Sequence, residues 1–319
     1  MKDILIAFFV STGACLVLGP FLIPALRRLK FGQSVRDDGP KRHLQKQGTP
    51  TMGGVMFLFS LTLGTVFVAQ ESLITYVLLI FTLGYGLIGF IDDYIKIIKK
   101  RSLGLKARDK LIGQLILSVL LAWSAVNYLG RGTQLLVPFI GNTFDLGVFY
   151  IPFVVFVAIG TTNAVNLTDG LDGLAAGITL FVSLGYVLLG FSEELFSITV
   201  FSAALVGSCL GFLFFNIHPA KVFMGDTGSL ALGGAIAALA VFTKTELFLP
   251  IIGGVYVLEA LSVIMQVISF KLTGQRIFLM SPLHHHFELK GWSEERVVLT
   301  FWTAAALLVV AGLMSYNYT

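Results

Sequence analysis

A chain of 319 residues in which 56% are hydrophobic and only 13% are charged has too few polar side chains to cover a soluble fold of this size. This composition excludes a cytosolic enzyme, a disordered regulator and a secreted disulfide scaffold. The formal net charge of +4 would suit nucleic acid binding in a soluble protein, but in a membrane protein excess Lys and Arg report orientation, so we expect no nucleic acid partner.

Ten apolar segments are candidates for crossing a bilayer, for which about 20 residues are needed. They cover residues 4–26, 53–69, 73–91, 111–129, 146–159, 171–190, 195–215, 230–242, 247–270 and 297–316. The first segment lacks a small-residue cleavage site, so it is interpreted as a retained helix. The only two cysteines, Cys15 and Cys209, lie inside apolar runs and have no metal-ligand or redox spacing. We therefore predict an all-α polytopic membrane protein with residues 1–319 in a single transmembrane domain.

The Lys and Arg residues are unevenly distributed over the connections. Seven follow the first segment, seven follow the third and four lie between the ninth and the tenth, so that with Lys221 one side holds 19 of the 22. The positive-inside rule then predicts cytoplasmic connections at about 27–52, 92–110, 160–172, 216–229 and 271–296. Both termini are expected to be extracytoplasmic.

Acidic residues gather at the same side. The five that fall at segment ends there are Asp92, Asp93, Asp169, Asp172 and Asp226. A carboxylate at a membrane surface needs a cation, a metal or water to be tolerated. We therefore expect the active site at the cytoplasmic face.

The adjacent pair Asp92 and Asp93 follows the third apolar run. Neighbouring residues on a helix point about 100° apart, so the two carboxylates are expected to have different roles. One interpretation makes one of them a Mg²⁺ ligand and the other a general base. The alternative is that both are solvated acids balancing Lys96 and Lys99.

The stretch TNAVNLTDGLDGL, residues 162–174, interrupts apolar sequence with Asn, Thr, Asp and Gly. Non-helical backbone at membrane depth is tolerated where it lines a cavity, which predicts a polar pocket containing Asn166, Asp169 and Asp172. The alternative is a helix N-cap, with Thr168 or Asp169 capping and Asp172 in the first turn.

The stretch FMGDTGS, residues 223–229, opens the eighth segment. The free N–H groups at a helix start attract phosphate, and Asp226 is suited to hold a cation that bridges to it. The alternative is again a plain N-cap. The stretch is not a Walker motif, because it lacks the Lys of the GK[ST] form.

Three consecutive histidines, His284, His285 and His286, lie between the last two segments. Consecutive side chains on regular backbone do not converge on one metal ion, so hydrogen bonding to anionic oxygens is favoured over a zinc site. A solvated loop is the alternative.

Further candidates are single residues. Lys46 lies close to Thr49 and Thr51, and either Lys106 or Lys110 is placed to reach phosphate, with Lys110 preferred because it adjoins the fourth segment. Lys41 and Arg42 are equally well explained as anchors at the membrane surface. Glu259 and Gln266 lie seven residues apart on one helical face, where a buried carboxylate is expected to have a function.

The motifs TPTMGG, DDY, NLTDGLDGL, FMGDTGSLALGG and PLHHHFE together resemble the polyprenyl-phosphate N-acetylhexosamine-1-phosphate transferases. The resemblance covers nearly the whole chain, and the HHH run favours the phospho-N-acetylmuramoyl-pentapeptide transferase branch. It implies transfer of phospho-MurNAc-pentapeptide from UDP-MurNAc-pentapeptide to undecaprenyl phosphate, which yields lipid I and UMP. It also implies a Mg²⁺ cofactor and a location in the bacterial inner membrane.

The resemblance also implies roles for individual residues. Asp226 corresponds to the Mg²⁺ ligand, Asp93 to a support for metal or phosphate, and Asp92 to the base that deprotonates the lipid phosphate. His284 and His285 correspond to catalytic residues near the sugar phosphate. The substrate-binding set is Lys46, Thr51, Lys110, Asn166, Asp169, Asp172, Asn216, Phe223, Gly225, Ser229, Gln266 and His286. Within it, Phe223 is suited to stack on uracil, Lys46 to contact the base and Lys110 to contact phosphate.

Two other functions are compatible with part of this pattern. A sibling transferase that uses another UDP-N-acetylhexosamine differs only in its donor. A secondary transporter also uses broken helices and buried acids, but it places them near the bilayer midplane, whereas the five Asp residues lie at one face. The partners expected are the two substrates and the lipid bilayer, and the small residues 207–211 suit either internal packing or a homodimer face.

Overall fold

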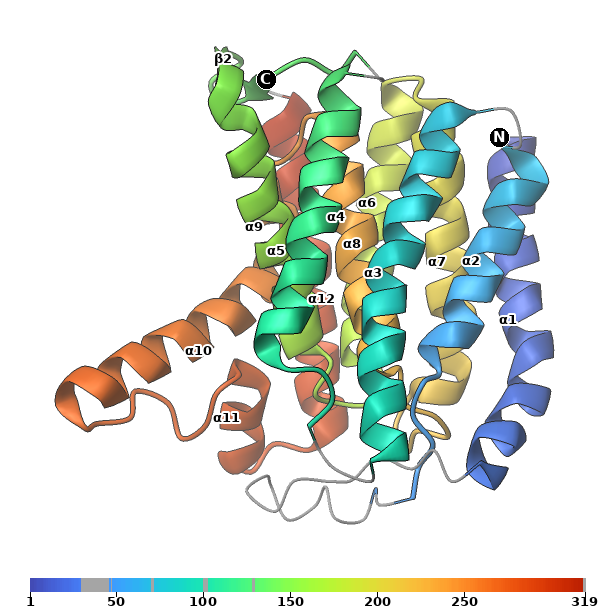
Figure 1. Cartoon of the computed structure of the whole chain (residues 1–319), viewed down its shortest axis with the longest axis vertical. Helices are drawn as coiled ribbons and strands as arrows, with labels where there is room; N and C mark the ends of the chain where they lie inside the picture. Colours follow the sequence, from blue (N-terminus) through green and yellow to red (C-terminus); the bar gives the residue numbers. More distant parts are fainter. Residues whose placement is uncertain (30–45, 47, 70–71, 100–102, 128–129, 318–319) are drawn as a thin grey trace.

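The computed structural model describes residues 1–29, 46, 48–69, 72–99, 103–127 and 130–317. These residues form a bundle of helices that run roughly parallel to one long axis (Figure 1). The helices are α1 (Lys2–Arg28), α2 (Gly54–Val68), α3 (Leu73–Ile98), α4 (Ala107–Asn127), α5 (Tyr150–Thr168), α6 (Leu174–Ser192), α7 (Phe196–Asn216), α8 (Gly225–Thr243), α9 (Leu249–Ile252), α10 (Gly254–Thr273), α11 (Leu283–Leu289) and α12 (Glu294–Asn317). The predicted all-α class is confirmed.

The described residues also contain a small hairpin and a 3₁₀ turn that follows it. Strands β1 (Gln134–Leu136) and β2 (Thr143–Asp145) pair antiparallel, with Leu135 opposite Phe144, and the 3₁₀ turn covers Gly147–Phe149. The hairpin follows α4 and lies at the end of the bundle where both chain termini are found (Figure 1).

The described part of the chain contains nine helices that are long and apolar enough to cross a membrane. The shorter apolar helix α2, of 15 residues, corresponds to the second predicted segment. The polytopic membrane character predicted from composition is therefore confirmed. Because successive helices alternate in direction, α1, α3, α5 and α7 end where α2, α4, α6 and α8 begin, and we call this the site end (Figure 1).

Helix α8 lies at the centre of the bundle and packs against α3 and α5. Its sequence is rich in Ala and Gly, and small residues let helix backbones approach closely in a membrane protein. A Cβ atom on Gly89 would overlap the carbonyl group of Asp226, and one on Gly54 would overlap the backbone of Gly228. The close packing of α2, α3 and α8 thus brings their site ends into contact.

The ninth predicted segment, residues 247–270, is not a single helix. The short helix α9 ends before Gly253, and α10 leaves the bundle at an angle and projects from its side (Figure 1). The adjacent Gly253 and Gly254 lower the helical propensity at the break, and Pro250 lies in the first turn of α9. Leu258, Ile264 and other apolar side chains on α10 are exposed, as expected for contact with lipid.

Several helices, among them α3, α5 and α8, extend further toward the site end than the sequence predicted. Helix α3 continues to Ile98, α5 to Thr168, and α8 begins at Gly225. The prediction of non-helical backbone before Asp169 was therefore wrong for residues 163–168. Polar side chains do not end these helices, because they find partners on neighbouring helices, as described below.

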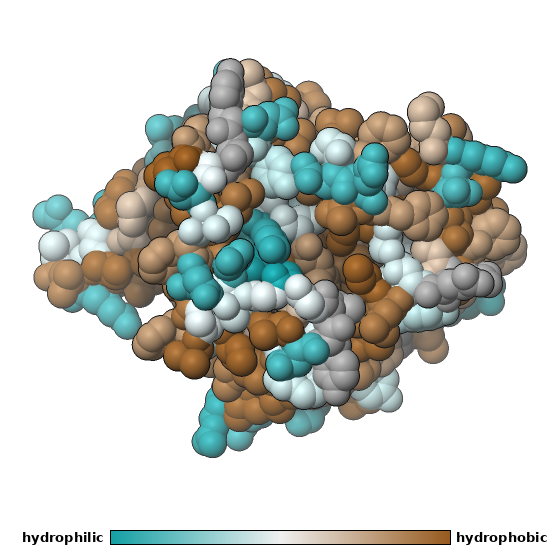
Figure 2. Space-filling model, turned by 90° about the horizontal axis from the view of Figure 1, so that it is seen from above, coloured by the Kyte–Doolittle hydropathy of each residue, from teal (hydrophilic) through white to brown (hydrophobic). Residues whose placement is uncertain are grey.

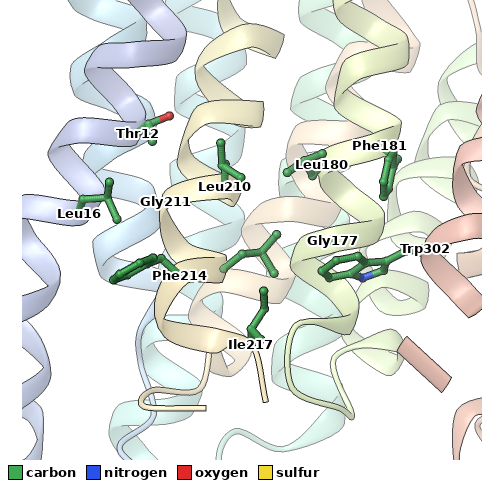
Figure 3. Close-up of a pocket in the computed structure, with 11 residues that line it drawn as sticks. Thr12, Leu16, Gly177, Leu180, Phe181, Leu210, Gly211, Phe214, Ile217 and Trp302 are labelled. Atoms are coloured by element: carbon green, nitrogen blue, oxygen red, sulfur yellow. The ribbon is translucent and has the colours of Figure 1, made fainter. Parts of the chain in front are cut away.

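An apolar cavity of about 400 Å³ lies between α1, α6, α7 and α12 (Figure 3). Leu16, Leu180, Phe214 and Trp302 contribute to its wall. Its lining offers almost no polar atoms, so it has no group for catalysis. Trp302 donates a hydrogen bond from Nε1 to the carbonyl oxygen of Gly173 at 3.2 Å, which ties this wall to the connection between α5 and α6.

The end of the bundle that carries the termini contains a buried ion pair. The Arg131 guanidinium donates to both carboxylate oxygens of Glu246 at 2.6 and 2.7 Å, and to the carbonyl oxygen of Val241 at 2.9 Å. The hydroxyl of Tyr150 donates to Glu246 at 2.8 Å. Figure 2, which looks onto this end, shows hydrophilic residues gathered around a hollow in a largely hydrophobic face. The pair connects the segment after α4 to the segment after α8.

Breaking this pair is expected to destabilise the protein. Glu246→Leu leaves the buried Arg131 without a counter-charge, which costs about 3–5 kcal/mol, whereas replacing both residues by apolar ones is often close to neutral. We expect Glu246→Leu to lower the melting temperature in detergent more than the double variant Arg131→Leu/Glu246→Leu. A double variant that melts below both single variants would contradict this assignment.

Candidate active site

Three carboxylates meet at the site end. Asp92 and Asp93 come from the last turns of α3, Asp226 comes from the first turn of α8, and one oxygen of each lies within 4.8 Å of the others. Asp92 and Asp93 are buried, whereas the side chain of Asp226 is 20% exposed. Three like charges so close together require positive charge nearby.

Two lysines supply positive charge to this cluster. Nζ of Lys96 lies 2.6 Å from Oδ2 of Asp92 and 3.1 Å from Oδ2 of Asp226. Nζ of Lys110 lies 2.9 Å from the same oxygen of Asp226, while Lys106 is exposed. The structure thus brings Lys110, the preferred of the two candidates, to the acids. The sequence interpretation did not place Lys96 in the site, although its spacing from Asp92 on one helix was the available signal.

Asp93 has a different set of partners from Asp92. Its carboxylate accepts hydrogen bonds from the backbone N–H groups of Asp226 at 3.2 Å and Thr227 at 2.9 Å, and from the Thr227 hydroxyl at 2.7 Å. It therefore caps the start of α8 from the neighbouring helix α3. Asp92 instead accepts from the N–H of Leu105 at 2.8 Å. The two adjacent acids thus have different hydrogen-bonding partners, although both lie near Nζ of Lys96, at 2.6 and 3.5 Å.

Gly225 lies against this cap. Its φ angle is +72°, and a Cβ atom there would come within 2.5 Å of Oδ2 of Asp93 and 2.8 Å of Oγ1 of Thr51. Both the backbone conformation and the space therefore favour glycine. Thr51 is buried in the segment that precedes α2.

Backbone hydrogen bonds align the segment before α2 with the segment before α8. The N–H of Phe223 donates to Pro50 at 2.8 Å, and the N–H groups of Gly53 and Gly54 donate to Phe223 and Met224, both at 2.9 Å. These bonds hold the partly exposed ring of Phe223 at the site end. The predicted binding residues Thr51, Phe223 and Gly225 are thus neighbours.

Asn166 orients Asp226 from α5. Its Nδ2 donates to Oδ1 of Asp226 at 3.1 Å and to the hydroxyl oxygen of Ser229 at 2.7 Å. The Ser229 hydroxyl donates in turn to the carbonyl oxygen of Gly225 at 3.1 Å. One oxygen of Asp226 therefore contacts an amide, and the other contacts the two lysines.

A second charged cluster contains the predicted binding residues Lys46 and Asp172. Nζ of Lys46 lies 2.7 Å from Oδ1 of Asp172 and 2.6 Å from Oε1 of Glu294. Nδ1 of His218 lies 3.0 Å from Oδ2 of Asp172. The sequence interpretation missed His218 and Glu294, which lie immediately after α7 and at the start of α12. The alternative in which Thr168 or Asp169 caps α6 and Asp172 lies in its first turn is wrong, because the N-cap residue is Gly173 and Asp172 precedes the helix.

Asp169 ends α5 and lies near several other acids. Burial, followed by the neighbouring charges of Asp226, Asp93 and Asp172, raises the pKa of Asp169 to about 8. A carboxyl with such a pKa takes up a proton at neutral pH and releases it when positive charge arrives.

This raised pKa predicts a pH-dependent stability. The unfolded value is about 3.9, so between about pH 4 and pH 8 the folded protein binds more protons than the unfolded chain, and stability falls as the pH rises through this range. We expect Asp169→Asn to raise the melting temperature in EDTA, with a gain that increases from pH 6 to about pH 8 and then levels off. A gain that is constant from pH 5 to pH 9 would show that Asp169 does not titrate in this way.

Asn216 and Gln266 are engaged with backbone groups. The side-chain oxygen of Asn216 accepts from the N–H of Gly173 at 3.0 Å, and its Nδ2 donates to Val222 at 2.9 Å. The side-chain oxygen of Gln266 accepts from the N–H groups of Ile277 and Phe278, and its Nε2 donates to the carbonyl oxygen of Phe278, in the segment that follows α10. Asn216 thus ties two connections of the site together, while Gln266 lies on the projecting helix.

The three histidines on α11 have separate partners. His284 is buried, with Nδ1 3.1 Å from Oε2 of Glu259. Nδ1 of His285 lies 2.7 Å from Oε2 of Glu288, and Nδ1 of His286 accepts from the N–H of Leu279 at 3.1 Å. Desolvation, and then Lys290, lower the pKa of His286. The histidines therefore do not converge on a single point. This agrees with the expectation that consecutive side chains on regular backbone do not share one metal ion.

The acids of the first cluster fit a hard divalent cation. Asp92, Asp93 and Asp226 offer carboxylate oxygens, which are the ligands that Mg²⁺ prefers. The partly exposed side chain of Asp226 provides access from outside, while the capping bonds leave Asp93 with less free acceptor capacity. The donor set therefore favours Asp226 as the principal ligand.

Comparison with known proteins agrees with this geometry. Residues 74–244, which run from α3 to the end of α8 and contain the three acids of the cluster, match the model described as glycosyl transferase family 4. The matched helices carry the site of carboxylates and lysines at one end of the membrane bundle. The chain is therefore a polytopic membrane transferase of the glycosyl transferase family 4 class. Residues 46–58, which include Lys46 and Thr51, match signature 1 of phospho-N-acetylmuramoyl-pentapeptide-transferase.

Curated relatives extend the match over the whole chain. The phospho-N-acetylmuramoyl-pentapeptide-transferase of Desulfitobacterium hafniense is 56% identical over 99% of this chain and 98% of the relative. Those of Pelotomaculum thermopropionicum and Bacillus subtilis are 57% and 55% identical, over 98% and 97% of this chain and 98% and 95% of the relatives. The chain belongs to the phospho-N-acetylmuramoyl-pentapeptide-transferase family. The resemblance found in the motifs is confirmed.

Proposed function

We propose that this protein transfers phospho-MurNAc-pentapeptide from UDP-MurNAc-pentapeptide to undecaprenyl phosphate in peptidoglycan synthesis. A phosphate oxygen of the lipid attacks the phosphorus that carries the sugar, the bond to the second phosphate breaks, and UMP leaves. The observation that carries this proposal is the meeting of Asp226, Asp92 and Lys110 at one end of a membrane bundle whose relatives carry the transferase name. There a water-soluble donor and a lipid acceptor can meet.

The protein's side chains have distinct tasks in this reaction. Mg²⁺, held by Asp226, would neutralise the phosphates and so reduce the repulsion between two anionic substrates. Lys110 and Lys96, both within 3.1 Å of Asp226, are placed to share that charge. Asp92, buried beside them, is the base that takes the proton of the lipid phosphate. Asp93 holds the start of α8 in place through its three hydrogen bonds.

The donor's nucleotide is proposed to bind between the two charged clusters. Phe223 offers a partly exposed ring for stacking on uracil, next to the buried Thr51. Lys46 and Asp172, which pair with each other at 2.7 Å, supply a donor and an acceptor for the base. His285, partly exposed on α11, is placed to contact the sugar phosphate.

The orientation and the location follow from charge. The site end holds most of the Lys and Arg residues, so we propose that it faces the cytoplasm. Both termini then lie on the extracytoplasmic side of the bacterial inner membrane. This orientation would place the acids where the UDP-linked donor is made. Cysteine labelling of intact cells at positions near Met1 and near Asp109 would test it, with only the first position reacting with an impermeant reagent.

The activity is tested with purified protein in detergent, Mg²⁺ and undecaprenyl phosphate. UDP-MurNAc-pentapeptide and UDP-GlcNAc are compared as donors, and released UMP is measured. We expect UMP only from the muramoyl donor, and none in EDTA. Release from UDP-GlcNAc instead would assign the protein to a sibling specificity, and no release from either donor would contradict the proposed function.

A further inference from the structure

A buried carboxylate on the projecting helix α10 contacts the start of α11. Glu259 has no exposed surface, and its Oε2 accepts a hydrogen bond from the N–H of Leu283 at 2.8 Å. The same oxygen lies 3.1 Å from Nδ1 of His284. Its other oxygen, Oε1, is buried without a hydrogen-bonding partner among the described residues. Glu259 therefore acts almost entirely on α11.

The opposite side of the His284 ring faces the connection between α5 and α6, residues 169–173. Its Nε2 abuts Gly170, where an added Cβ atom would overlap the ring. Gly170 follows Asp169 in the connection between α5 and α6, and Asp172 lies two residues further on. The chain of contacts therefore runs from α10, through the His284 ring, to the segment that carries two acids of the site.

Electrostatics determine which ring nitrogen of His284 carries a proton. A carboxylate oxygen 3.1 Å from a ring nitrogen repels a lone pair there, so this contact favours the tautomer of His284 that carries its proton on Nδ1. A buried carboxylate needs donors or cations beside it, and the partners of Glu259 are the N–H of Leu283 and Nδ1 of His284, so loss of the His284 contact is expected to be destabilising. His285 and His286 are only partly buried and contact Glu288 and Leu279 instead.

We propose that Glu259 is a positioning residue that acts through His284. It holds a proton on Nδ1 and orients the ring, and the ring supports the connection of residues 169–173 beside the Asp226 cluster. His284 is accordingly a support for the site. The kinetic part of this inference rests on the proposed transferase function.

Two variants of Glu259 separate positioning from simple packing. Glu259→Gln keeps an oxygen that can accept from the N–H of Leu283 and lie next to Nδ1 of His284, whereas Glu259→Leu removes this oxygen and keeps a side chain of similar size. We expect Glu259→Leu to lower kcat/KM for the donor at least about 30-fold, chiefly by raising KM, and Glu259→Gln to stay within about 3-fold of the parent. Asp109→Asn, an exposed acid on α4, is the control and should leave both constants unchanged.

A double variant tests whether the two residues act as a unit. His284→Leu combined with Glu259→Leu should lose no more activity than the worse single variant, because each change breaks the same contact. Losses that multiply would show that Glu259 and His284 act independently and would overturn the proposal.

Two measurements do not depend on activity. The sequence has 5 histidines, so spectra of protein labelled with ¹⁵N-histidine are simple enough to assign His284 with a His284→Gln variant. We expect a protonated Nδ1 that persists in Glu259→Gln and is lost in Glu259→Leu. Amide hydrogen exchange in residues 169–173 should accelerate in Glu259→Leu only. An unprotonated Nδ1 in the parent, or unchanged exchange in Glu259→Leu, would overturn the proposal, whereas absence of UMP release from the parent would contradict the proposed function alone.

Discussion

Asp226→Asn is expected to lower kcat/KM for transfer at least about 1,000-fold, the largest effect of any single substitution in this protein. Asp226 is the acid of the cluster with a partly exposed side chain, and its two oxygens are already oriented by Asn166 and by Lys96 and Lys110. Asparagine keeps the shape but removes the charge that a divalent cation requires. Mg²⁺ bound at this position could then no longer neutralise the two phosphates.

The measurement is the rate of UMP release over a range of Mg²⁺ concentrations. The melting temperature should stay within a few degrees of the parent, because the substitution removes one of three mutually repelling charges. Asp109→Asn, which changes an exposed acid outside the cluster, should retain full activity. An Asp226→Asn protein that keeps a tenth of the activity, or recovers it at high Mg²⁺, would exclude Asp226 as the principal ligand.

Gly225→Ala is expected to reduce activity at least about 100-fold, although the substitution adds a single methyl group and removes no charge. The added Cβ would lie 2.5 Å from Oδ2 of Asp93, the oxygen that accepts from the N–H and the hydroxyl of Thr227. Asp93 must then move, and the first turn of α8 moves with it. Because Asp226 lies in that turn, its carboxylate shifts relative to Lys110 and Asn166.

A second glycine isolates this steric effect from backbone strain. Gly274 has a φ of +71°, against +72° at Gly225, but an added Cβ there meets nothing within 4 Å. Both alanine variants carry the cost of a left-handed residue, about 1–2 kcal/mol, so both should lower the melting temperature. Only Gly225→Ala should lose UMP release, and similar activity in the two variants would show that the Asp93 cap does not control the site.

Much of the architecture could be predicted from sequence because its physical cause is local. Each spanning helix is marked by its own apolar run, since a backbone in lipid must satisfy its hydrogen bonds within the segment. The polar motifs around Asp92, Asp169 and Asp226 stood out because such residues are costly at the ends of apolar runs unless they have partners. The same motifs carried the family resemblance. The position of these motifs at one end of the bundle was predicted by counting the membrane-crossing segments between them.

The direction that α10 takes after the break at Gly253 is a feature that only the tertiary structure decided. Residues 247–270 read as one uninterrupted apolar run, and nothing in their hydrophobicity distinguishes a straight helix from a bent one. The direction of α10 is set by its packing against α5, α11 and α12. Those contacts include the 3.1 Å approach of Glu259 to His284, a residue predicted from sequence to be catalytic.

The partners of individual charges were likewise beyond the sequence. Asp93 caps a helix 134 residues away, and Lys46 pairs with Glu294 across 248 residues. Local patterns identify which side chains need a partner, because burial of a charge is unfavourable wherever it occurs. Which partner each one finds depends on how closely the helices pack, and that distance is set by glycines such as Gly54 and Gly89, whose role appears only when two backbones meet.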